Sequence, residues 1–488
     1  MLEETMFRRK FSLNLYKNRR LMLAEMKFGN KPLKTERGDI YPRLFEKGVF
    51  EENCSDGKYI FEPGNGFASA AHLMGRFNPY STYEITPSEF PDGAKAGFLI
   101  AWPGNMLYVY ARRESGKAVF CADYAGAHYR AGEIEYAEGM KFLFTFHAGI
   151  YMEMYAEADG VVRHAGDVRI EALEILRDEK VFSGADACMY VEADRCVKID
   201  KCLNYLDSGI MQADIRPVKY ENGEVMVENG KIYFTYTCRF ETEMMQQVAS
   251  YRLSTCEFNL EGALLFEAGD GKWCGDVAST LIYDRNCGVW RVWMCVFSHG
   301  HVLAYGETKN DLRFGINVVD VKPLAPAQSE TAFGGREGDE DPDLFYDEKA
   351  DMWYLAVCRN DPACGKYRYY LFSSGRPDGG FAFVSRTDDS IETTGGSFVR
   401  IGDEIRFVFG RSFSEMSKYD ICEFPSLRKT GELKCNHPDG GFRGWGSVME
   451  IPCGTRKRLL WATFDRMRGS DYNWSYGNLY FFESDTIR

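Results

Sequence analysis

The sequence predicts an all-β protein in which an N-terminal two-sheet β-sandwich of the jelly-roll type is followed by a five-bladed β-propeller. Three observations predict this class. Aromatic residues make up 15% of the 488 residues and glycine contributes 48, a composition typical of strands joined by tight turns. Apolar residues alternate with a period of two in the first part of the chain. In the second part, pairs of apolar strands recur every 52 to 60 residues.

Four segments are expected along the chain. Residues 1–55 are mixed and charged and are predicted to form an N-terminal arm. Residues 56–180 hold short alternating strands separated by Gly, Pro, Asp and Asn turns, which predicts the β-sandwich. The order and length of these strands resemble the concanavalin and laminin-G jelly rolls. Residues 181–210 are interpreted as a connector, and residues 211–488 as the propeller.

The propeller prediction rests on five segments that each pair two apolar strands across a turn. They are EVMVENGKIYFTYTCR, TLIYDRNCGVWRVWMCVFSH, DLFYDEKADMWYLAVCR, SFVRIGDEIRFVFGR and SVMEIPCGTRKRLLWATFDR. The segments end at Arg239, His299, Arg359, Arg411 and Arg466, at spacings of 60, 60, 52 and 55 residues. Repeats of this length with several strands each are typical of β-propellers. Asp boxes and WD repeats do not occur, which argues against sialidase-type and WD40 propellers.

The five basic residues at the strand ends are candidate substrate-binding residues. In a propeller blade the first strand starts and the second strand ends on the same face, around a central funnel. If the four arginines share one register, their guanidinium groups converge there and suit planar anions, because each offers a bidentate fork. Trp445 precedes the fifth inner strand and is a candidate for stacking on a sugar ring.

Carboxylates near the starts of the first strands are the candidate catalytic residues. They are Asp214 and Glu224 in the first repeat, Asp276 in the second, and Asp341 and Asp343 in the third. Hydrolysis of a glycosidic bond usually needs two carboxyl groups, one protonated and one ionised. Crowding raises the pKa of one carboxyl group, and nearby arginines keep another ionised.

The stretch Asp341-Pro342-Asp343-Leu344 opens an inner strand, and a second, aromatic strand follows it. It resembles the D-P-x-[IL]-x-x-D opening of the five-bladed propeller glycoside hydrolases, which include the arabinanase/β-xylosidase and invertase-like families. The resemblance implies that the propeller is the catalytic domain of a glycosidase acting on small oligosaccharides. It further implies that Asp214 or Glu224 is the base and Asp276 tunes it, while Asp341 or Asp343 takes the role of the acid. The invertase motifs W-M-N-D-P-N-G and E-C-P do not occur, so no family is assigned.

Two other functions are compatible with the same residues. With arginines neutralising a uronate, His299 or His301 could abstract a proton in a β-elimination, which describes a polysaccharide lyase. Alternatively, the sandwich and the funnel only bind carbohydrate. The arginines favour a substrate that contains an acidic sugar.

Charge and composition restrict the partners and the compartment. The formal net charge of −13 argues against nucleic acid, and no apolar stretch reaches the roughly 18 residues of a membrane span. The 15 cysteines lack CxxC or zinc spacing and are expected as buried free thiols, which favours a cytoplasmic location. The expected partner is an oligosaccharide. No nucleotide cofactor motif occurs; a structural Ca²⁺ ion and a homo-oligomer are compatible with the sequence.

Overall fold

The computed structural model describes residues 2–29, 46–147, 149–324, 338–361, 364–388, 392–411, 418–436, 442–465 and 477–487, without the side chains of 442–445 and 486–487. Within these residues it contains 38 strands, against one four-residue α-helix and three 3-10 helices. The predicted all-β class is therefore confirmed. None of the described helices is long and apolar enough to cross a membrane.

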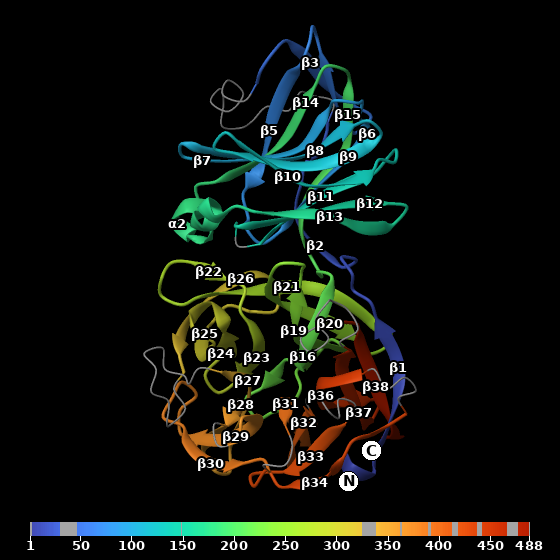
Figure 1. Ribbon diagram of the computed structural model, residues 1–488. Helices are drawn as coiled ribbons and strands as arrows, with labels where there is room; N and C mark the ends of the chain where they lie inside the picture. The colour runs from blue at the N-terminus through green and yellow to red at the C-terminus, as the bar shows by residue number, and fades with distance from the viewer. Residues whose placement is uncertain are drawn as a thin grey trace. The chain divides into compact units, whose positions relative to one another are not determined.

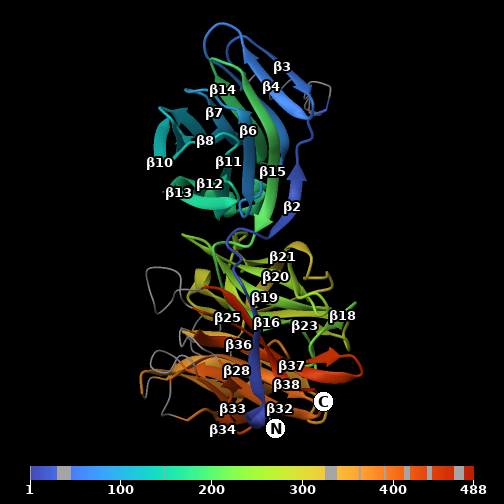
Figure 2. The same ribbon diagram turned by 90° about the vertical axis from the view of Figure 1, so that its right-hand side faces the viewer.

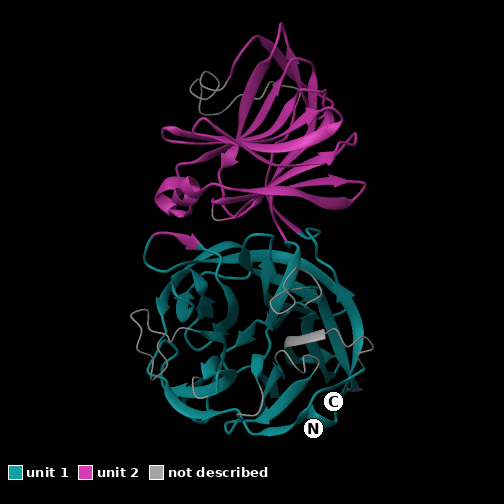
Figure 3. Cartoon of the chain, viewed as in Figure 1, with its two compact units in different colours: residues 1–19, 208–270, 274–488 teal, residues 20–207, 271–273 magenta. Residues whose placement is uncertain are grey.

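The chain forms two compact units, shown in different colours in Figure 3. Unit 1 comprises residues 1–19, 208–270 and 274–488, and unit 2 comprises residues 20–207 and 271–273. Unit 2 is thus inserted into the sequence of unit 1. The two ends of the long insertion meet within unit 1, because the Arg19 N–H donates to Ser208 Oγ at 3.2 Å and the Ser208 N–H donates to the Arg19 carbonyl at 3.0 Å.

Unit 2 contains one 14-stranded sheet in the order β3-β4-β15-β6-β11-β12-β13-β10-β9-β8-β7-β14-β5, and β2 also pairs with β15. The strands are β2 (Arg20–Glu25), β3 (Phe50–Ser55), β4 (Lys58–Pro63), β5 (Ala68–Arg76), β6 (Thr82–Glu89), β7 (Lys95–Trp102), β8 (Asn105–Glu114), β9 (Lys117–Tyr124), β10 (Ala127–Glu135), β11 (Lys141–His147), β12 (Tyr151–Ala158), β13 (Val161–Arg169), β14 (Asp186–Ala193) and β15 (Val197–Asp207). The helices η2 (Glu171–Arg177) and α2 (Glu179–Phe182) lie between β13 and β14 in the chain.

The two halves of this sheet face each other across one apolar core. Phe98 on β7 lies 5.2 Å from Tyr83 on β6, and Phe120 on β9 lies 5.7 Å from Phe142 on β11, measured between ring centroids. Alternating side chains of each strand therefore enter this core, as the period-two pattern predicts. The segment interpreted as a connector, residues 181–210, contributes β14 and β15 to the sheet.

The described strands of unit 1 form four sheets (Figure 1), and the 11-stranded sheet joins two antiparallel sets through the parallel pair β21–β26, which gives five antiparallel sets. Set 1 holds β16 (Met211–Pro217), β19 (Lys231–Arg239), β20 (Met244–Arg252) and β21 (Glu257–Glu267). Set 2 holds β23 (Val277–Asp284), β24 (Val289–Val296), β25 (Val302–Thr308) and β26 (Gly315–Pro323). Set 3 holds β27 (Asp339–Asp347), β28 (Met352–Asp361), β29 (Lys366–Ser374) and β30 (Ala382–Arg386). Set 4 holds β31 (Thr393–Ile401), β32 (Glu404–Arg411), β33 (Tyr419–Glu423) and β34 (Lys429–Glu432).

The fifth set joins both ends of the chain. It holds β36 (Phe442–Cys453), β37 (Arg456–Asp465), β38 (Leu479–Ile487) and β1 (Met6–Leu13), and β1 pairs antiparallel with β38 (Figure 2). The predicted arm, residues 1–55, is thus divided: β1 belongs to unit 1, whereas β2 and β3 belong to unit 2. Short elements complete unit 1: η1 (Leu2–Glu4), β17 (Lys219–Tyr220), β18 (Val227–Glu228), β22 (Trp273–Cys274, of which Trp273 is counted with unit 2), η3 (Phe297–His299) and β35 (Lys434–Cys435).

Apolar clusters pack each set of unit 1 against the next. Sets 1 and 2, sets 2 and 3, sets 3 and 4, and sets 4 and 5 each share a buried cluster. Set 5 in turn packs on set 1, because Phe481 lies 5.9 Å from Phe234 and 5.2 Å from Tyr251. The five sets therefore close a ring, and most of the aromatic residues of unit 1 lie between its sheets.

All 15 cysteines are free, and nine of them are buried. The buried thiols pack as small apolar side chains within both units. This agrees with their expected role.

Candidate functional site

A β-bulge recurs at the same register in the inner strand of every set. The pairing slips between Ala213 and Arg216, Val277 and Thr280, Glu340 and Asp343, Thr394 and Ser397, and Arg443 and Ser447. In sets 1 to 4 the first bulged residue has a positive φ: 51° at Asp214, 57° at Ala278, 50° at Asp341 and 61° at Gly395. A non-glycine residue in this region costs about 1–3 kcal/mol and is common at functional sites. These strand starts are therefore candidate positions for a functional site.

The bulges of sets 1, 2 and 3 line one cavity of about 290 Å³ in unit 1. Its lining comes from three neighbouring sets and combines carboxylates, a histidine, an arginine and apolar side chains. These residues are Asp214, Arg239, Met244, Val277, Ala278, Cys295, Phe297, His301, Glu340, Asp341 and Tyr367. The cavity is close in size to the small end of ligand sites, which start at about 300 Å³.

Asp341 is oriented by groups from two other sets. Its Oδ2 accepts a hydrogen bond from the Gly395 N–H at 3.1 Å and from Thr394 Oγ1 at 3.3 Å. Its Oδ1 lies 3.8 Å from Nη2 of Arg216, a residue of β16 that is 5% exposed. Arg216 is itself fixed, because its Nη1 donates to the Gly396 carbonyl at 3.0 Å. The Asp341 carboxylate is thus preorganised at the cavity wall.

Asp214 occupies the equivalent position in set 1. The Thr237 hydroxyl of β19 donates to Asp214 Oδ2 at 2.7 Å, and Asp214 is 9% exposed. The bulge turns this carboxylate toward the cavity.

Asp276 precedes the bulge of set 2 and is 5% exposed. Burial raises its pKa, whereas hydrogen bonds from Ser298 and the charge of His299 lower it. Both bonds come from one residue: Ser298 N–H donates to Oδ1 at 3.0 Å and Ser298 Oγ donates to Oδ2 at 2.6 Å. Since burial is the largest effect, Asp276 keeps its proton to a higher pH than an exposed aspartate does.

Glu340 forms a pair with His301. His301 Nε2 lies 2.8 Å from Glu340 Oε1, and the His301 ring lies 4.3 Å from that of Phe297. Burial and then the charge of Glu340 raise the pKa of Tyr367 to about 12. Burial is the largest effect that raises the pKa of Cys295, and the charges of Glu340, Asp341 and Asp276 raise it further.

Glu340 and Tyr367 were not among the site residues predicted from the sequence. Glu340 stands next to Asp341 in the acidic run GDEDPD, and that run was the available signal. No pattern in the sequence shows which of its carboxylates faces a cavity.

Asp343, a predicted catalytic residue, is buried in the interior of unit 1. It is 1% exposed, and its Oδ1 accepts from Lys219 Nζ at 2.6 Å and from Thr280 Oγ1 at 3.2 Å. Its Oδ2 accepts from the Phe398 N–H at 2.6 Å. Asp343 is therefore not among the cavity residues, and it ties set 3 to sets 2 and 4 and to β17.

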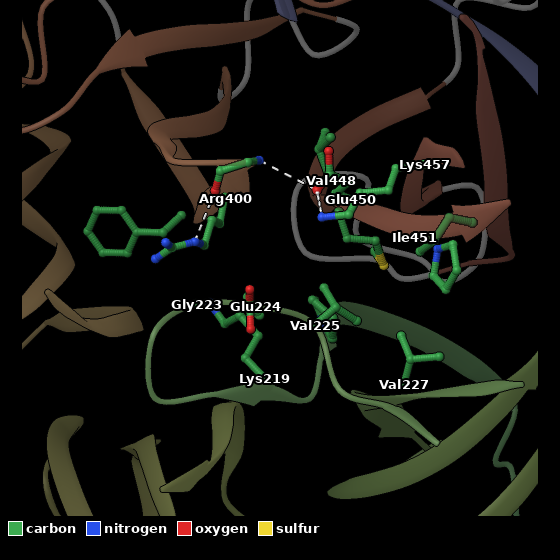
Figure 4. A pocket seen from close by; sticks show the side chains of 15 residues that line it. Lys219, Gly223, Glu224, Val225, Val227, Arg400, Val448, Glu450, Ile451 and Lys457 are labelled. Carbon is green, nitrogen blue, oxygen red and sulfur yellow. Dashed lines mark hydrogen bonds and ion pairs between the residues drawn. The ribbon is translucent and has the colours of Figure 1, made fainter. Parts of the chain in front are cut away.

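Glu224, the other predicted base, lines a different cavity of about 190 Å³ (Figure 4). Arg400 and Val448 also line it, and the Glu224 side chain is 51% exposed and lies 3.8 Å from Arg285. The structure does not bring Glu224 together with Asp214 and Asp341.

The predicted common register of the arginines is wrong. The last pairs before the bulges are Ala213–Thr237, Glu340–Cys358 and Thr394–Gly410. Arg239 therefore stands two residues beyond its pair, whereas Arg359 and Arg411 stand one residue beyond theirs. A shift of one residue turns a strand side chain to the opposite face.

Arg359 and Arg411 instead form buried ion pairs inside their own sets. Arg359 donates to both oxygens of Asp339 at 2.7 Å. Arg411 donates to Asp420 and to Glu432, each at 2.7 Å. Of the five predicted basic residues, Arg239 lines the cavity.

The remaining predicted residues lie elsewhere or outside the described part. His299 belongs to η3; its Nδ1 lies 2.9 Å from Ser298 Oγ and its Nε2 lies 3.5 Å from Asp270. Trp445 lies on β36, but its side chain is not among those described, and Arg466 lies outside the described residues. Among the described residues, no group of three or more His, Cys, Asp or Glu side chains is placed to hold a metal ion.

Comparisons with known proteins were made by family, by sequence and by structure. No protein-family model matches the chain, and no curated protein matches it. The structure is similar to the catalytic domain of a GH62 α-L-arabinofuranosidase from Coprinopsis cinerea, at 12% identity and a TM-score of 0.38, covering 57% of this chain and 98% of that one. It is also similar to fructan 1-exohydrolase IIa from Cichorium intybus, at 12% identity and a TM-score of 0.38, covering 55% and 54%.

A third similar structure is a family 117 glycoside hydrolase from the marine bacterium Zobellia galactanivorans, at 10% identity and a TM-score of 0.39, covering 56% and 84%. These similar structures are glycoside hydrolases of the propeller type, and no family is assigned to this chain.

Proposed function

We propose that the protein is a glycoside hydrolase that cleaves small oligosaccharides in the cavity of unit 1. One observation carries this proposal. The same bulge in sets 1 and 3 directs Asp214 and Asp341 into one cavity, where Glu340 joins them. Carboxyl groups that face each other across a bond are what glycosidic hydrolysis requires.

The proposed architecture is a five-bladed β-propeller with an inserted β-sandwich of the jelly-roll type. The five strand sets of unit 1 correspond to the blades, since each packs on the next and the fifth packs on the first. Strand β1 completes the fifth blade. The facing halves of the sheet in unit 2 correspond to the two layers of the sandwich.

Within the cavity, Asp214 is assigned as the base or nucleophile and Glu340 as the acid. Glu340 is favoured over Asp341 because a second group that can carry a proton, His301 Nε2, lies 2.8 Å from its Oε1. Asp341, held by donors from two sets, orients the substrate and Asp276 adjusts the local charge. Arg239 provides a donor for a sugar hydroxyl or for the carboxylate of an acidic sugar. A cytoplasmic location is part of the proposal, supported by the fifteen free cysteines.

Turnover of arabino-, fructo-, galacto- and uronate-containing oligosaccharides tests the assignment. Asp214→Asn and Glu340→Gln are each expected to lower kcat by about 10²–10⁴-fold, because each removes a proton-transfer group or nucleophile without changing shape. Glu224→Gln is the matched control, since Glu224 lines the other cavity, and it is expected to retain activity.

Wild-type turnover in both cavity variants would refute the site. A product that absorbs in the ultraviolet as an unsaturated uronate would replace hydrolysis by β-elimination. Binding without turnover of any substrate would leave a carbohydrate-binding protein.

A further inference from the structure

A third cavity, of about 530 Å³, lies on unit 2 over strands β5, β7, β8, β9 and β14. It is on the face of these strands opposite the core. Tyr108 on β8 pairs with Asp123 on β9 and with Leu99 on β7, and Leu99 pairs with Cys188 on β14, so these side chains share one face. The alternate residues, such as Phe98 on β7, enter the core instead.

Tyr108 and Tyr190 bring aromatic rings to the lining of this cavity, and apolar residues of the same sheet face support them. Leu99, Ala71 and Cys188 are buried and pack against Tyr108 and Tyr190. The rings of Tyr108 and Tyr190 meet edge to face, with centroids 4.9 Å apart. Tyr124 also borders the cavity, but its ring stacks on Trp102 at 5.9 Å and packs against the core on the other face of the sheet.

Hydrogen bonds fix the polar groups around these rings. Tyr190 donates to Glu192 Oε2 at 2.7 Å, and Lys95 Nζ lies 2.8 Å from Glu192 Oε1. Tyr110 donates to Asp123 Oδ2 at 2.9 Å. The carboxylates are therefore held in place at the cavity, which lowers the cost of ordering them when a ligand binds.

Other polar groups of the cavity form fewer or weaker hydrogen bonds within the protein. The Tyr108 hydroxyl is directed to the Met106 thioether at 3.8 Å, a weak acceptor. The Asn105 side-chain amide donates to the Pro103 carbonyl at 3.1 Å, which leaves its oxygen as an acceptor. Donors and acceptors thus stand beside the partly exposed ring of Tyr108.

The charges of the side chains that line the cavity sum to zero. Lys47 and Lys95 carry two positive charges, and Asp123 and Glu192 carry two negative charges. An anionic ligand would meet the carboxylates, and a cationic ligand would meet the lysines. The cavity therefore suits a ligand that is neutral, presents many hydroxyl groups, and has an apolar face.

From this combination we infer that unit 2 binds a neutral saccharide over β7, β8, β9 and β14. The C–H face of a sugar ring packs on the tyrosines, and its hydroxyls bond to Asp123, Glu192, Lys95 and the Tyr108 hydroxyl. The volume lies within the roughly 300–1,000 Å³ of small-molecule sites. This site belongs to unit 2 and does not rest on the hydrolysis proposed for unit 1.

Calorimetric titration of the full chain tests this inference. The chain carries Asp214→Asn, so that turnover does not interfere, and the probes are cellotriose, xylotriose, arabinotriose, mannotriose and, as the acidic probe, trigalacturonate. At least one neutral trisaccharide is expected to bind. Tyr108→Ala is expected to raise its Kd about tenfold or more, as truncation of a central aromatic contact does. Tyr108→Phe keeps the ring and is expected to bind more tightly than Tyr108→Ala.

Tyr151→Ala is the matched control, because Tyr151 is a partly buried tyrosine of unit 2 outside the cavity. It is expected to leave the Kd unchanged. Glu192→Gln provides a second variant if Tyr108→Ala does not fold. It leaves the lining with a surplus of one positive charge, so trigalacturonate should gain affinity relative to the neutral probes.

Three results would overturn the inference: binding of none of the neutral probes, binding that Arg239→Ala weakens but Tyr108→Ala does not, and equal losses in Tyr108→Ala and Tyr151→Ala. The second result would assign the saccharide to the unit 1 cavity. Because the readout is binding, a failure of the proposed hydrolysis would leave this test intact.

Discussion

Asp341 and Asp343 are two residues apart on one strand and have different surroundings. Asp341 faces a cavity, whereas Asp343 is buried against Lys219 of β17 and also accepts bonds from sets 2 and 4. Burial lowers the pKa of Lys219, and the charge of Asp343 opposes that effect. The pair therefore holds the ring together, and neither residue is available to a substrate.

Removing the Asp343 carboxylate should destabilise unit 1. Asp343→Ala leaves the buried Lys219 charge without its partner, which is expected to cost about 3–5 kcal/mol in the free energy of unfolding. Urea denaturation followed by tryptophan fluorescence measures the loss. The double variant Lys219→Met with Asp343→Leu removes both charges and is expected to recover most of it. A stable Asp343→Ala single variant would contradict this role.

At this scale the sequence predicted residue types better than residue positions. It selected Asp214 and Asp341, because acidic residues at strand starts are visible in the sequence. It placed four arginines in one register, yet Arg359 and Arg411 pair with Asp339 and Asp420 in their own sets. The strands end in similar residues. The pairing register decides which face a side chain takes, and that register is set by contacts between residues far apart in the sequence.

Among the elements, the inner strands were predictable and their bulges were not. Alternating apolar residues and the D-P motif correctly indicate a strand at β27. The bulge depends on where β27 slips against β28, between Glu340 and Asp343, and a single sequence carries no record of that slip. This slip also explains why Glu340 and Asp341 both line the cavity.

Strand β1 is the element whose place was least predictable. Its residues are charged and mixed, so residues 1–55 read as an arm, but Phe7 pairs with Ser484, near the other end of the chain. Phe7 is 0% exposed and its ring lies 5.8 Å from that of Trp461. A strand whose partner is that distant leaves no local pattern beyond its own alternation.

Phe7→Ala should therefore weaken the closure of unit 1. The expected loss is about 3–5 kcal/mol, the usual cost of truncating a fully buried phenylalanine. Met6→Ala in the same strand is the control, since Met6 is 37% exposed and its truncation is expected to change stability by about 0.5 kcal/mol or less. Thermal and urea unfolding of the two variants provide the comparison, and equal stabilities would refute the closing role of β1.

For the whole molecule, the sequence predicted two all-β domains in order along the chain. The structure instead inserts unit 2 into unit 1, at Arg19 and Ser208. The insertion was not visible because the first segment of unit 1 is only 19 residues long and precedes the alternating block. The two ends of the insertion, Arg19 and Ser208, are hydrogen-bonded neighbours, so they can be joined directly if the insertion is removed.

A chain without residues 20–207 should still fold as unit 1. Joining Arg19 to Ser208 through a short Gly-Ser linker keeps the neighbouring ends together, and loops at such sites tolerate change well. Trp273→Ser is included, because Trp273 packs on Phe182 of the deleted segment, with ring centroids 4.4 Å apart. We expect a monodisperse protein with one cooperative unfolding transition and β-type circular dichroism. Aggregation of this chain would show that unit 1 depends on unit 2.

The pairing of β1 with β38 also orders the events of synthesis. Strand β1 is synthesised well before its partner strand β38, Leu479–Ile487. Unit 2 has every strand of its sheet within residues 20–207, so it can fold while most of unit 1 is still untranslated. Until β38 is synthesised, the edge of β1 that pairs with it stays open, and other chains can join it there. A ribosome that stalls before residue 479 would release a finished unit 2 attached to an unclosed ring, a species suited to capture by chaperones.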